Sequence, residues 1–228
     1  MDYFVYGETE IAHLKACDPI LGKAIEDIGP IRRRVTPDLF AALFQSIVGQ
    51  QISTKAQATI MARMEAALAP ITAEKIDALT EAELQSFGIS FRKASYIKEI
   101  AGMVARGEFD LSELSDLSDD EVSKRLSQLK GIGIWTAEML MIFSMQRPNI
   151  FSYDDLAILR GLRMLYRHRK ITPALFAKYR RRYAPYASVA SLYLWAIAGG
   201  ACPKLTDHAP LTEAQKKKRR KEKSQKTE

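Results

Sequence analysis

The chain has 228 residues, 47% of them hydrophobic and 27% charged, with a formal net charge of +7. This composition is ordinary for a globular protein of one or two small domains with a real core. It has only two cysteines, Cys17 and Cys202, which exclude a disulfide framework and an iron–sulfur cluster. No secretory signal opens the chain, and the apolar stretch Val189 to Cys202 is too short to span a bilayer. We therefore expect an intracellular protein without membrane contact, in the bacterial cytoplasm and nucleoid or in a eukaryotic nucleus.

Most of the positive charge lies at the end of the chain. From Lys216 to Glu228 there are eight Lys and Arg and two Glu, a net of +6, so the rest of the chain carries only +1. We expect residues 213–228 to form a disordered basic tail that binds DNA nonspecifically and in a salt-sensitive way. A solubilising or nuclear-import tail is the equal alternative.

The first clear helix is predicted after Thr36, which would act as N-cap with Pro37 at the first helical position. Gly49 would end this helix. One face of it carries apolar residues at helical spacing, namely Phe40, Leu43, Phe44, Ile47 and Val48.

Further helix starts follow along the chain. Ser53 is predicted to cap a helix, and Thr80 with Glu83 and Ser118 with Glu121 have the form of capping boxes. The helix after Ser53 would bury Ala56, Ile60, Met64, Ala67 and Leu68. A helix between the two boxes would bury Ala94, Ile97, Ala101 and Val104.

The last predicted helix with a clear pattern follows Asp155. Its expected apolar face is Leu156, Leu159, Leu162 and Tyr166, and its expected basic face is Arg160, Arg163 and Arg167. No alternating strand of five or more residues and no repeat is found. The fold class is therefore predicted to be all-α.

The stretch from Leu129 to Ala137 is predicted to turn between two helices. Gly131 and Gly133 can take backbone angles closed to other residues and leave no side chain in the way. The N–H groups that open the next helix, at about Ile134, would point at a bound phosphate. This predicts a helix–hairpin–helix, which holds a nucleic-acid backbone without reading its sequence. The residues assigned to the DNA backbone are Lys130, Gly131, Gly133 and Thr136.

This hairpin, with Trp135 and with Asp155 twenty residues later, resembles the helix–hairpin–helix superfamily of base-excision DNA glycosylases. The nearest branch is the 3-methyladenine DNA glycosylase II family, and the resemblance covers about residues 10 to 205. It implies an all-α fold of two helical domains that flank a cleft with the active site. A central six-helix domain would span 37–149, and a second helical domain would combine 1–36 with 150–212.

Asp155 is the residue that the resemblance assigns to catalysis. Cleavage of the bond between a base and deoxyribose builds positive charge on the sugar. A fixed carboxylate stabilises that charge and orients or deprotonates the attacking water. N-capping of the next helix is the alternative, and it is compatible with catalysis because a helix dipole favours the ionised carboxylate. Asp154 is not assigned, because the essential carboxylate of the family stands second in the pair.

Trp135 determines the subtype that the resemblance implies. Lyase-type members have a lysine at this position, which attacks the sugar through a Schiff base, and a tryptophan cannot do so. Lys130 replaces the usual hairpin proline, and a phosphate contact is expected for it. Ile134 and Tyr153 also depart from the family pattern, which leaves the substrate range open.

The resemblance places Trp135, Trp195 and Met139 around the extruded base. Purines alkylated at N3 or N7 carry positive charge, and indole faces attract cations. The base would be held by stacking and shape rather than by a hydrogen-bond code. Core packing is the alternative for Trp135 and Met139.

The segment Gly49 to Ser53 resembles the family's wedge loop, which fills the gap left by the flipped nucleotide. Gln51 is the first choice for the intercalating residue, followed by Gln50 and Ser53, and a plain polar turn is the alternative. No cofactor is expected to be required. A structural Na⁺ or K⁺ at the hairpin, as in related enzymes, would be held by the backbone carbonyls of Ser127, Leu129 and Ile132.

The predicted function is a monofunctional, monomeric DNA glycosylase without lyase activity. It would hydrolyse the N-glycosidic bond of alkylated purines (3-methyladenine and 7-methylguanine class) in double-stranded DNA, by base flipping and Asp-assisted water attack, in base excision repair. The alternatives are a noncatalytic helix–hairpin–helix DNA-binding protein, a glycosylase for another lesion such as hypoxanthine, and a lyase-type repair enzyme.

Overall fold

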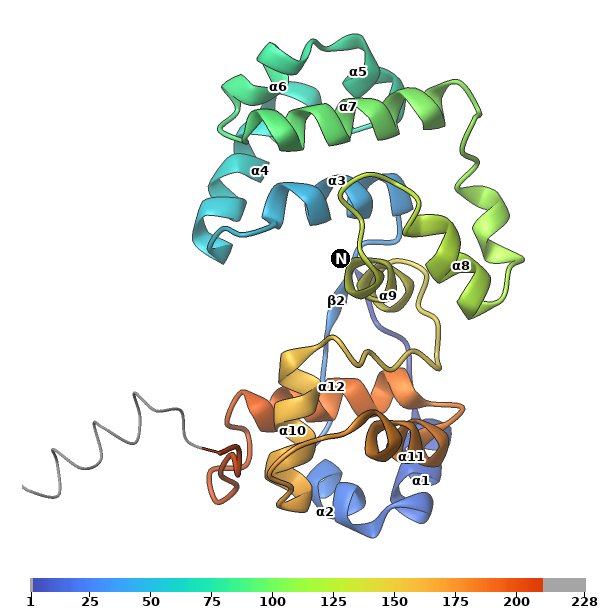
Figure 1. Cartoon of the computed structure of the whole chain (residues 1–228), viewed down its shortest axis with the longest axis vertical. Coiled ribbons are helices and arrows are strands. Elements are labelled where there is room, and N and C mark those ends of the chain that lie inside the picture. Colours follow the sequence, from blue (N-terminus) through green and yellow to red (C-terminus); the bar gives the residue numbers. More distant parts are fainter. Residues whose placement is uncertain (1, 211–228) are drawn as a thin grey trace, which may run out of the picture. The chain divides into compact units, whose positions relative to one another are not determined.

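The structure, a computed structural model, describes residues 2–210 and is helical nearly throughout (Figure 1). The described residues form twelve α-helices, one short 3₁₀-helix and two strands of two residues each. The all-α prediction is confirmed. The predicted basic tail, 213–228, lies outside the described residues. None of the described helices is both long and apolar enough to cross a membrane.

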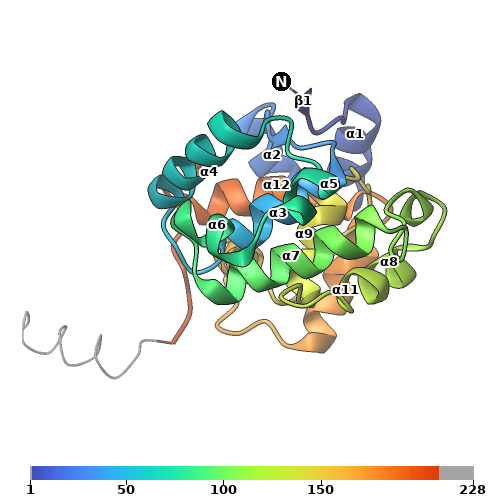
Figure 2. The same cartoon turned by 90° about the horizontal axis from the view of Figure 1, so that it is seen from above.

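The chain divides into two compact units. The first unit takes residues up to Val5 and Arg32–Asp154. Its elements are β1 (Asp2–Tyr3), β2 (Arg34–Val35), α3 (Leu39–Gly49), α4 (Thr54–Leu68), α5 (Ala73–Ala78), α6 (Glu81–Ser86), α7 (Phe91–Ala105), the 3₁₀-helix Ser112–Ser115, α8 (Asp119–Leu126) and α9 (Ile134–Phe143). Within this unit α7 packs against α3, α5 and α6, and α8 packs against α9 (Figures 1 and 2).

The second unit combines Tyr6–Ile31 with the described residues from Asp155 onward. Its elements are α1 (Glu8–Cys17), α2 (Pro19–Ile28), α10 (Leu156–Tyr166), α11 (Pro173–Tyr183) and α12 (Ala187–Ala198). The pair α10 and α12 makes the most extensive helix contact in this unit. Both chain ends therefore contribute to one helical body.

The boundaries of the units differ from the expected 37–149 at both ends. The strands β1 and β2 pair in antiparallel fashion, with Asp2 opposite Val35, which ties the first residues to the first unit. The N–H of Thr36 donates to the carbonyl of Phe143 at 2.8 Å, so residue 36 also belongs there. The described part of the first unit holds seven α-helices, two of which, α5 and α6, are short.

The predicted face of α3 is confirmed, because Phe40, Leu43, Phe44, Ile47 and Val48 are all buried. The predicted start at Thr36 is wrong. The helix begins at Leu39, and the side chain of Asp38 accepts from the N–H of Ala41 at 2.9 Å. Aspartate is a better N-cap than threonine, and Asp38 stands directly before the first helical residue.

The predicted caps further along the chain are confirmed. Ser53 caps α4, and both capping boxes are formed, at the starts of α6 and α8. The predicted stripe of α4 is partly wrong, because Ala67 is exposed and Met61 is buried in its place.

The predicted apolar face of α10 is partly wrong, because Leu162 is buried as predicted and Leu159 and Tyr166 are half-buried, but Leu156 is exposed. Leu156 is 80% exposed, and the buried positions are Ile158, Gly161, Leu162, Met164 and Leu165. The reason is the close packing on α12, in which a Cβ built on Gly161 would lie 2.5 Å from the carbonyl oxygen of Leu194. Gly161 permits this approach, and its neighbours on the same side are buried with it.

A buried ionic cluster holds the second unit together. Asp18 is 1% exposed and caps α2 by accepting from the N–H groups of Ile20 and Leu21. Its Oδ2 accepts from Arg182 Nη1 at 2.6 Å and from the hydroxyl of Tyr166 at 2.7 Å. Burial raises the pKa of Tyr166, which therefore stays a neutral donor to this carboxylate. Sequence pattern gave no sign of this cluster.

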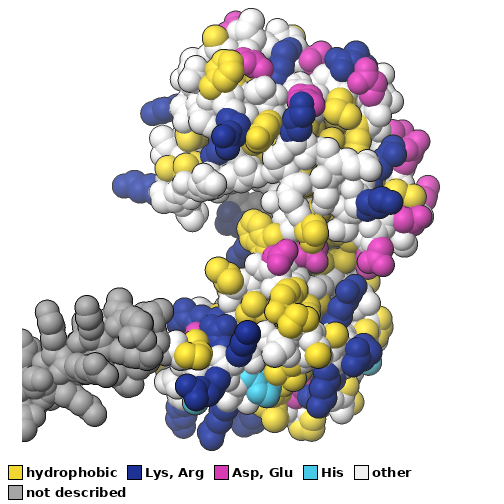
Figure 3. Space-filling view, viewed as in Figure 1, with side chains coloured by type: hydrophobic (Ala, Val, Ile, Leu, Met, Phe, Trp, Pro, Cys, Tyr) yellow, Lys and Arg dark blue, Asp and Glu magenta, His cyan; other side chains and the backbone are white. Residues whose placement is uncertain are grey.

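Charge is distributed unevenly between the two units. The first unit has 14 Lys and Arg against 17 Asp and Glu, a net of −3. In the second unit the segment 156–206 contains ten Lys and Arg and no acidic residue. Figure 3 shows the corresponding gathering of Lys and Arg side chains over the second unit.

Candidate active site

The predicted hairpin is formed in the first unit. α8 ends at Leu126, α9 begins at Ile134, and Gly131 between them has φ +86°. A Cβ on Gly131 would lie 2.5 Å from Tyr96 Cδ2, so the turn needs glycine here for both its angle and its space. The prediction of a special angle does not hold for Gly133, which has φ −88°. A Cβ on Gly133 would meet nothing within 4 Å, so this position faces open space.

The start of α9 is arranged for an anion. Gly133 is the N-cap of α9 and has no side chain to accept from the first turn. The first helical bond runs from the N–H of Ala137 to the carbonyl of Gly133 at 2.9 Å, so the N–H groups of the first turn make no bond within the helix itself. Such donors, with the positive end of the dipole, bind phosphate. Thr136, in the first turn of α9, is buried at 8% exposure.

Lys130 lies in the hairpin and pairs with Glu99, with Nζ and Oε2 2.9 Å apart. The carboxylate raises the pKa of Lys130 by hydrogen bonding and charge, so the ammonium is retained. Exposed ion pairs of this kind contribute little to stability. The lysine can therefore exchange Glu99 for a phosphate at small cost.

The predicted wedge loop is tied to the hairpin. Gln50 Nε2 donates to the carbonyl of Gly131 at 2.8 Å, across 81 residues of sequence. Lys93 Nζ donates to the carbonyls of Val48 and Gln50 at 2.8 and 2.6 Å. Burial lowers the pKa of Lys93. These bonds satisfy the C-terminal end of α3 and fix the loop beside the hairpin.

The three wedge candidates have different surroundings. Gln50 is engaged with Gly131, and the hydroxyl of Ser53 accepts from the N–H of Ala56 at 3.2 Å. Gln51 is exposed and has a left-handed backbone with φ +57°. Its side chain thus stands at the tip of the loop.

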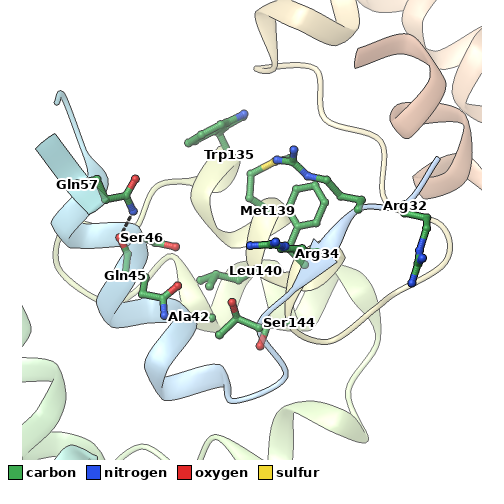
Figure 4. A pocket seen from close by; sticks show the side chains of 13 residues that line it. Arg32, Arg34, Ala42, Gln45, Ser46, Gln57, Trp135, Met139, Leu140 and Ser144 are labelled. Atoms are coloured by element: carbon green, nitrogen blue, oxygen red, sulfur yellow. Dashed lines mark hydrogen bonds between the residues drawn. The ribbon is translucent and has the colours of Figure 1, made fainter. Parts of the chain in front are cut away.

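Trp135 lies on the wall of a cavity of about 590 Å³ and is 46% exposed. Core packing is therefore not its role, and Met139 lines the same cavity (Figure 4). In the close-up the amide nitrogen of Gln57 donates to the carbonyl of Gln45, at 3.1 Å. The remaining lining residues are Arg32, Arg33, Arg34, Thr36, Ala42, Ser46, Leu140, Phe143 and Ser144.

A second cavity, also of about 590 Å³, lies on the same unit and shares four of these residues. The shared residues are Ser46, Gln57, Trp135 and Met139. Its other walls come from the wedge loop and the hairpin, through Gly49, Gln50, Gln51, Gly131 and Thr136. The indole of Trp135 thus adjoins the loop, the hairpin and both cavities.

Asp155 lies in the second unit and caps α10. Its Oδ1 accepts from the N–H groups of Ala157 and Ile158, each at 2.9 Å, and the residue is 7% exposed. The capping interpretation is confirmed. Both cap bonds go to one oxygen of the carboxylate, Oδ1.

Trp195 is half-buried on α12 in the same unit as Asp155. It follows Leu194, the residue whose carbonyl lies against Gly161 of α10. The two helices that carry Asp155 and Trp195 are therefore packed together. The predicted site residues fall into two sets, with Trp135, Met139, the hairpin and the wedge loop in the first unit and Asp155 and Trp195 in the second.

The carbonyls expected at a cation lie in the turn after α8. The carbonyl of Leu129 accepts from the N–H of Ile132 at 3.1 Å, which uses one of its two lone pairs. Ser127 Oγ is buried with no hydrogen-bond partner in the described part of the chain. An unsatisfied buried oxygen in an oxygen-rich turn fits a hard monovalent cation. Elsewhere, the described residues contain no group of three His, Cys, Asp or Glu suited to a metal.

Several residues of this region were not identified from the sequence. Tyr96 and Lys93 lie on α7, far from the motif, and only the tertiary contacts with Gly131 and Gln50 assign them a place. The sequence shows Arg32 to Arg34 as a basic triplet, but it does not show that this triplet lies on a cavity wall. Arg33 lies over the ring of Phe143, 5.0 Å from the ring centre.

The chain is similar in sequence and in fold to known proteins. Residues 44–185 match the family described as HhH-GPD superfamily base excision DNA repair protein. The chain is 32% identical over 192 residues to DNA-3-methyladenine glycosylase 1 of Schizosaccharomyces pombe, covering 80% of this chain and 84% of that protein. Its fold is similar to a crystal structure of a DNA-3-methyladenine glycosidase from Bacillus halodurans, with a TM-score of 0.80, 33% identity and coverage of 92% and 97%. It is also similar to a Schizosaccharomyces pombe 3-methyladenine DNA glycosylase in complex with abasic DNA, with a TM-score of 0.72, 30% identity and coverage of 84% and 97%.

Proposed function

The chain belongs to the HhH-GPD superfamily of base excision DNA repair proteins, and we propose that it is a monofunctional DNA glycosylase that removes alkylated purines from duplex DNA. The observation that carries this proposal is the exposed indole of Trp135 on the helix that follows the hairpin. An aromatic face beside a phosphate-binding turn and a cavity is what recognition of a flipped base requires. The names of the similar proteins support the alkylated-base class.

The hairpin is the proposed anchor for the DNA backbone. The N-terminus of α9 offers the positive end of a helix dipole to a phosphate, and the open space at Gly133 lets the phosphate approach the main chain. Lys130 supplies a point charge beside this site. None of these groups reads a base, so binding is independent of sequence.

Gln51 is the proposed wedge. It is exposed at the tip of a loop that Gln50 and Lys93 hold in place, so an inserted side chain meets a rigid support. Insertion fills the space of the extruded nucleotide and offsets part of the unstacking energy, which is a few kcal/mol.

Trp135, Met139 and Trp195 are the proposed base-holding residues. A cationic purine over an indole face gains about 0.5 to 2 kcal/mol, depending on how far it is desolvated. A neutral purine lacks this gain. Stacking on Trp135 therefore favours alkylated over normal purines without a hydrogen-bond code.

Asp155 is the proposed catalytic residue. Positive charge that develops on deoxyribose as the base departs is stabilised by a nearby carboxylate, and the same carboxylate receives a proton from the attacking water. The N–H groups of Ala157 and Ile158 donate to Oδ1 of Asp155, which fixes the position of the carboxylate at the start of α10. Capping and catalysis thus use one side chain in two ways.

Lyase chemistry is not part of the proposal. A Schiff base needs an amine at the sugar, and the position after the hairpin holds Trp135. The product would be an abasic site in an intact strand. No redox or organic cofactor enters this reaction. A Na⁺ or K⁺ held by the carbonyls of Ser127, Leu129 and Ile132, with Ser127 Oγ nearby, would supply positive charge for a DNA phosphate.

The proposed activity is tested by release of methylated purines from alkylated duplex DNA, with an Asp155→Asn variant beside the wild type. The wild type is expected to release base, and the variant is expected to be at least a hundredfold slower. Full activity of Asp155→Asn, or no release by the wild type, would defeat the proposal. The second result would favour the noncatalytic DNA-binding alternative. Trapping of a covalent adduct with borohydride would overturn the monofunctional subtype.

A glycosylase for a neutral lesion such as hypoxanthine is the second candidate. Arg32, Arg33 and Arg34 line the cavity beside Trp135, and guanidinium groups repel a cationic purine but not a neutral one. Release of hypoxanthine and of 7-methylguanine from matched duplexes separates the two candidates. Faster release of hypoxanthine would favour the second.

A further inference from the structure

The second unit carries a surface of unpaired cations that the proposed site does not use. Of the ten Lys and Arg in 156–206, Arg163 pairs with Asp207 at 2.7 Å and Arg182 pairs with Asp18 at 2.6 Å. Arg160 lies 3.9 Å from Asp207. Six of the others are exposed, cluster at the end of α10 and along α11, and make no ion pair with any described residue. These six are Arg167, Arg169, Lys170, Lys178, Arg180 and Arg181, and we call them the α10–α11 basic surface.

An aromatic cluster brings these cations together. The rings of Tyr166, at the end of α10, and Tyr179, on α11, stack with centres 4.5 Å apart. The hydroxyl of Tyr166 also lies 2.6 Å from that of Tyr183, and His168 Nε2 lies 2.8 Å from the hydroxyl of Tyr179. The loop that follows α10 is thereby held against α11. Its cations and those of α11 belong to one surface.

The pattern of α11 directs its cations outward. Phe176, Tyr179 and Tyr183 are buried at helical spacing, and Lys178, Arg180 and Arg181 are exposed on the remaining positions. Figure 3 shows Lys and Arg side chains over this unit with few acidic ones among them.

Helix stabilisation does not account for this surface. Cations in the last turns of α10 and α11 interact favourably with the helix dipoles. Arg169 and Lys170, however, stand just before Thr172, the N-cap of α11, where a positive charge is unfavourable. Uncompensated like charges also repel one another and destabilise the folded unit. A polyanion that binds there relieves this repulsion.

We propose that the α10–α11 basic surface binds the phosphate backbone of duplex DNA, as a second contact in addition to the hairpin. This inference rests on the proposed function only in taking DNA as the partner. Duplex DNA carries one charge per about 1.7 Å of helix axis, so several neighbouring cations are neutralised at once. The contact is independent of sequence and of damage, and it retains the enzyme on undamaged DNA between lesions.

The test compares two double variants of the full chain that have the same net charge. The surface variant is Lys178→Gln with Arg181→Gln, which lie on one face of α11. The control variant is Lys15→Gln with Lys23→Gln in the same unit. Lys15 already pairs with Glu26, and Lys23 already pairs with Asp27. Thermal denaturation of both variants checks that the fold is retained. Affinity for an undamaged duplex is measured against salt concentration.

Each lost phosphate contact lowers the slope of log K against log salt by about 0.9, so the surface variant is expected to lose about 1.8. Its dissociation constant at low salt is expected to rise roughly tenfold or more, whereas the control variant keeps the wild-type slope. Equal losses in both variants would overturn the proposal in favour of a net-charge effect. Unchanged slopes in both would also overturn it, because the surface would then contact no phosphate. This test does not depend on base release, which is measured separately. A wild type that binds undamaged DNA with a steep salt dependence but releases no base would defeat the proposed function and leave this inference standing.

Discussion

The sharpest prediction concerns Gly131→Ala, because the structure separates two contributions to its effect. The φ of +86° costs an alanine about 1–2 kcal/mol, as for any residue with a Cβ in the left-handed region. The new methyl would also lie 2.5 Å from Tyr96 Cδ2, and overpacking of this kind costs about 1–3 kcal/mol. The expected loss of unfolding free energy is about 2–5 kcal/mol, a large fraction of the stability of a typical domain.

The matched control is Gly133→Ala. Its φ is −88° and its Cβ would meet nothing within 4 Å, so its stability is expected to change by less than about 1 kcal/mol. Its methyl group would occupy the space through which a phosphate approaches α9, so DNA affinity is expected to fall. Gly131→Ala is thus expected to lower mainly the stability of the protein, and Gly133→Ala mainly its affinity for DNA.

Chemical denaturation of both variants, followed by circular dichroism, measures the stability difference, and duplex titration measures affinity. In a Tyr96→Ala background the clash is gone, so Gly131→Ala should cost only the backbone part, about 1–2 kcal/mol. The reasoning fails if Gly131→Ala is no more destabilising than Gly133→Ala. It also fails if removal of the Tyr96 ring leaves the cost of Gly131→Ala unchanged.

Four further predictions follow from the same geometry. Asp155→Asn is expected to keep the α10 cap and its stability, whereas Asp155→Ala loses the cap and about 1 kcal/mol; equal melting temperatures for the two would contradict the cap. Lys93→Met removes the two hydrogen bonds that Lys93 donates to the end of α3, and it is expected to lower the unfolding free energy by about 1–3 kcal/mol. It is also expected to slow base release, measured by single-turnover kinetics, more than it weakens duplex affinity. Lys130→Gln breaks only an exposed ion pair with Glu99, so we expect an unchanged denaturation midpoint and several-fold weaker DNA binding. A large loss of stability would show that Lys130 cannot exchange Glu99 for a phosphate at small cost. Truncation before Lys216 should weaken nonspecific affinity and lower its salt dependence while turnover at saturating DNA is retained, and a loss of that turnover would show that the tail serves the chemistry.

Local signals predicted local structure well. The capping boxes at Thr80 and Ser118 and the buried face of α3 are confirmed, because each depends on residues three or four apart that meet in any helix. The N-cap of α3 was wrongly predicted because a better local cap, Asp38, follows Thr36. In α10 a distant residue decided, because Leu156 turns outward where Gly161 fits against Leu194 of α12.

The sequence by itself determined the hairpin. Two glycines in a short turn between helices predict the hairpin. The expectation of hydrolysis without a Schiff base comes from the family resemblance, because Trp135 stands where lyase-type members have a lysine. These features depend on backbone angles and on the chemistry of single side chains, which residue identity alone specifies. The exposure of Trp135 at a cavity does not follow in this way, because an apolar helix is equally consistent with a core.

Only the tertiary structure decided which residues support that hairpin and where the charge lies. Tyr96 lies against Gly131 and comes from 35 residues earlier in the chain. Gln50 donates to the carbonyl of Gly131 and comes from 81 residues earlier. The basic surface likewise emerges because stacked tyrosines hold the end of α10 against α11, in a chain whose net charge outside the last thirteen residues is only +1. Net charge is a sum over the whole chain, whereas binding depends on which charges the fold sets side by side.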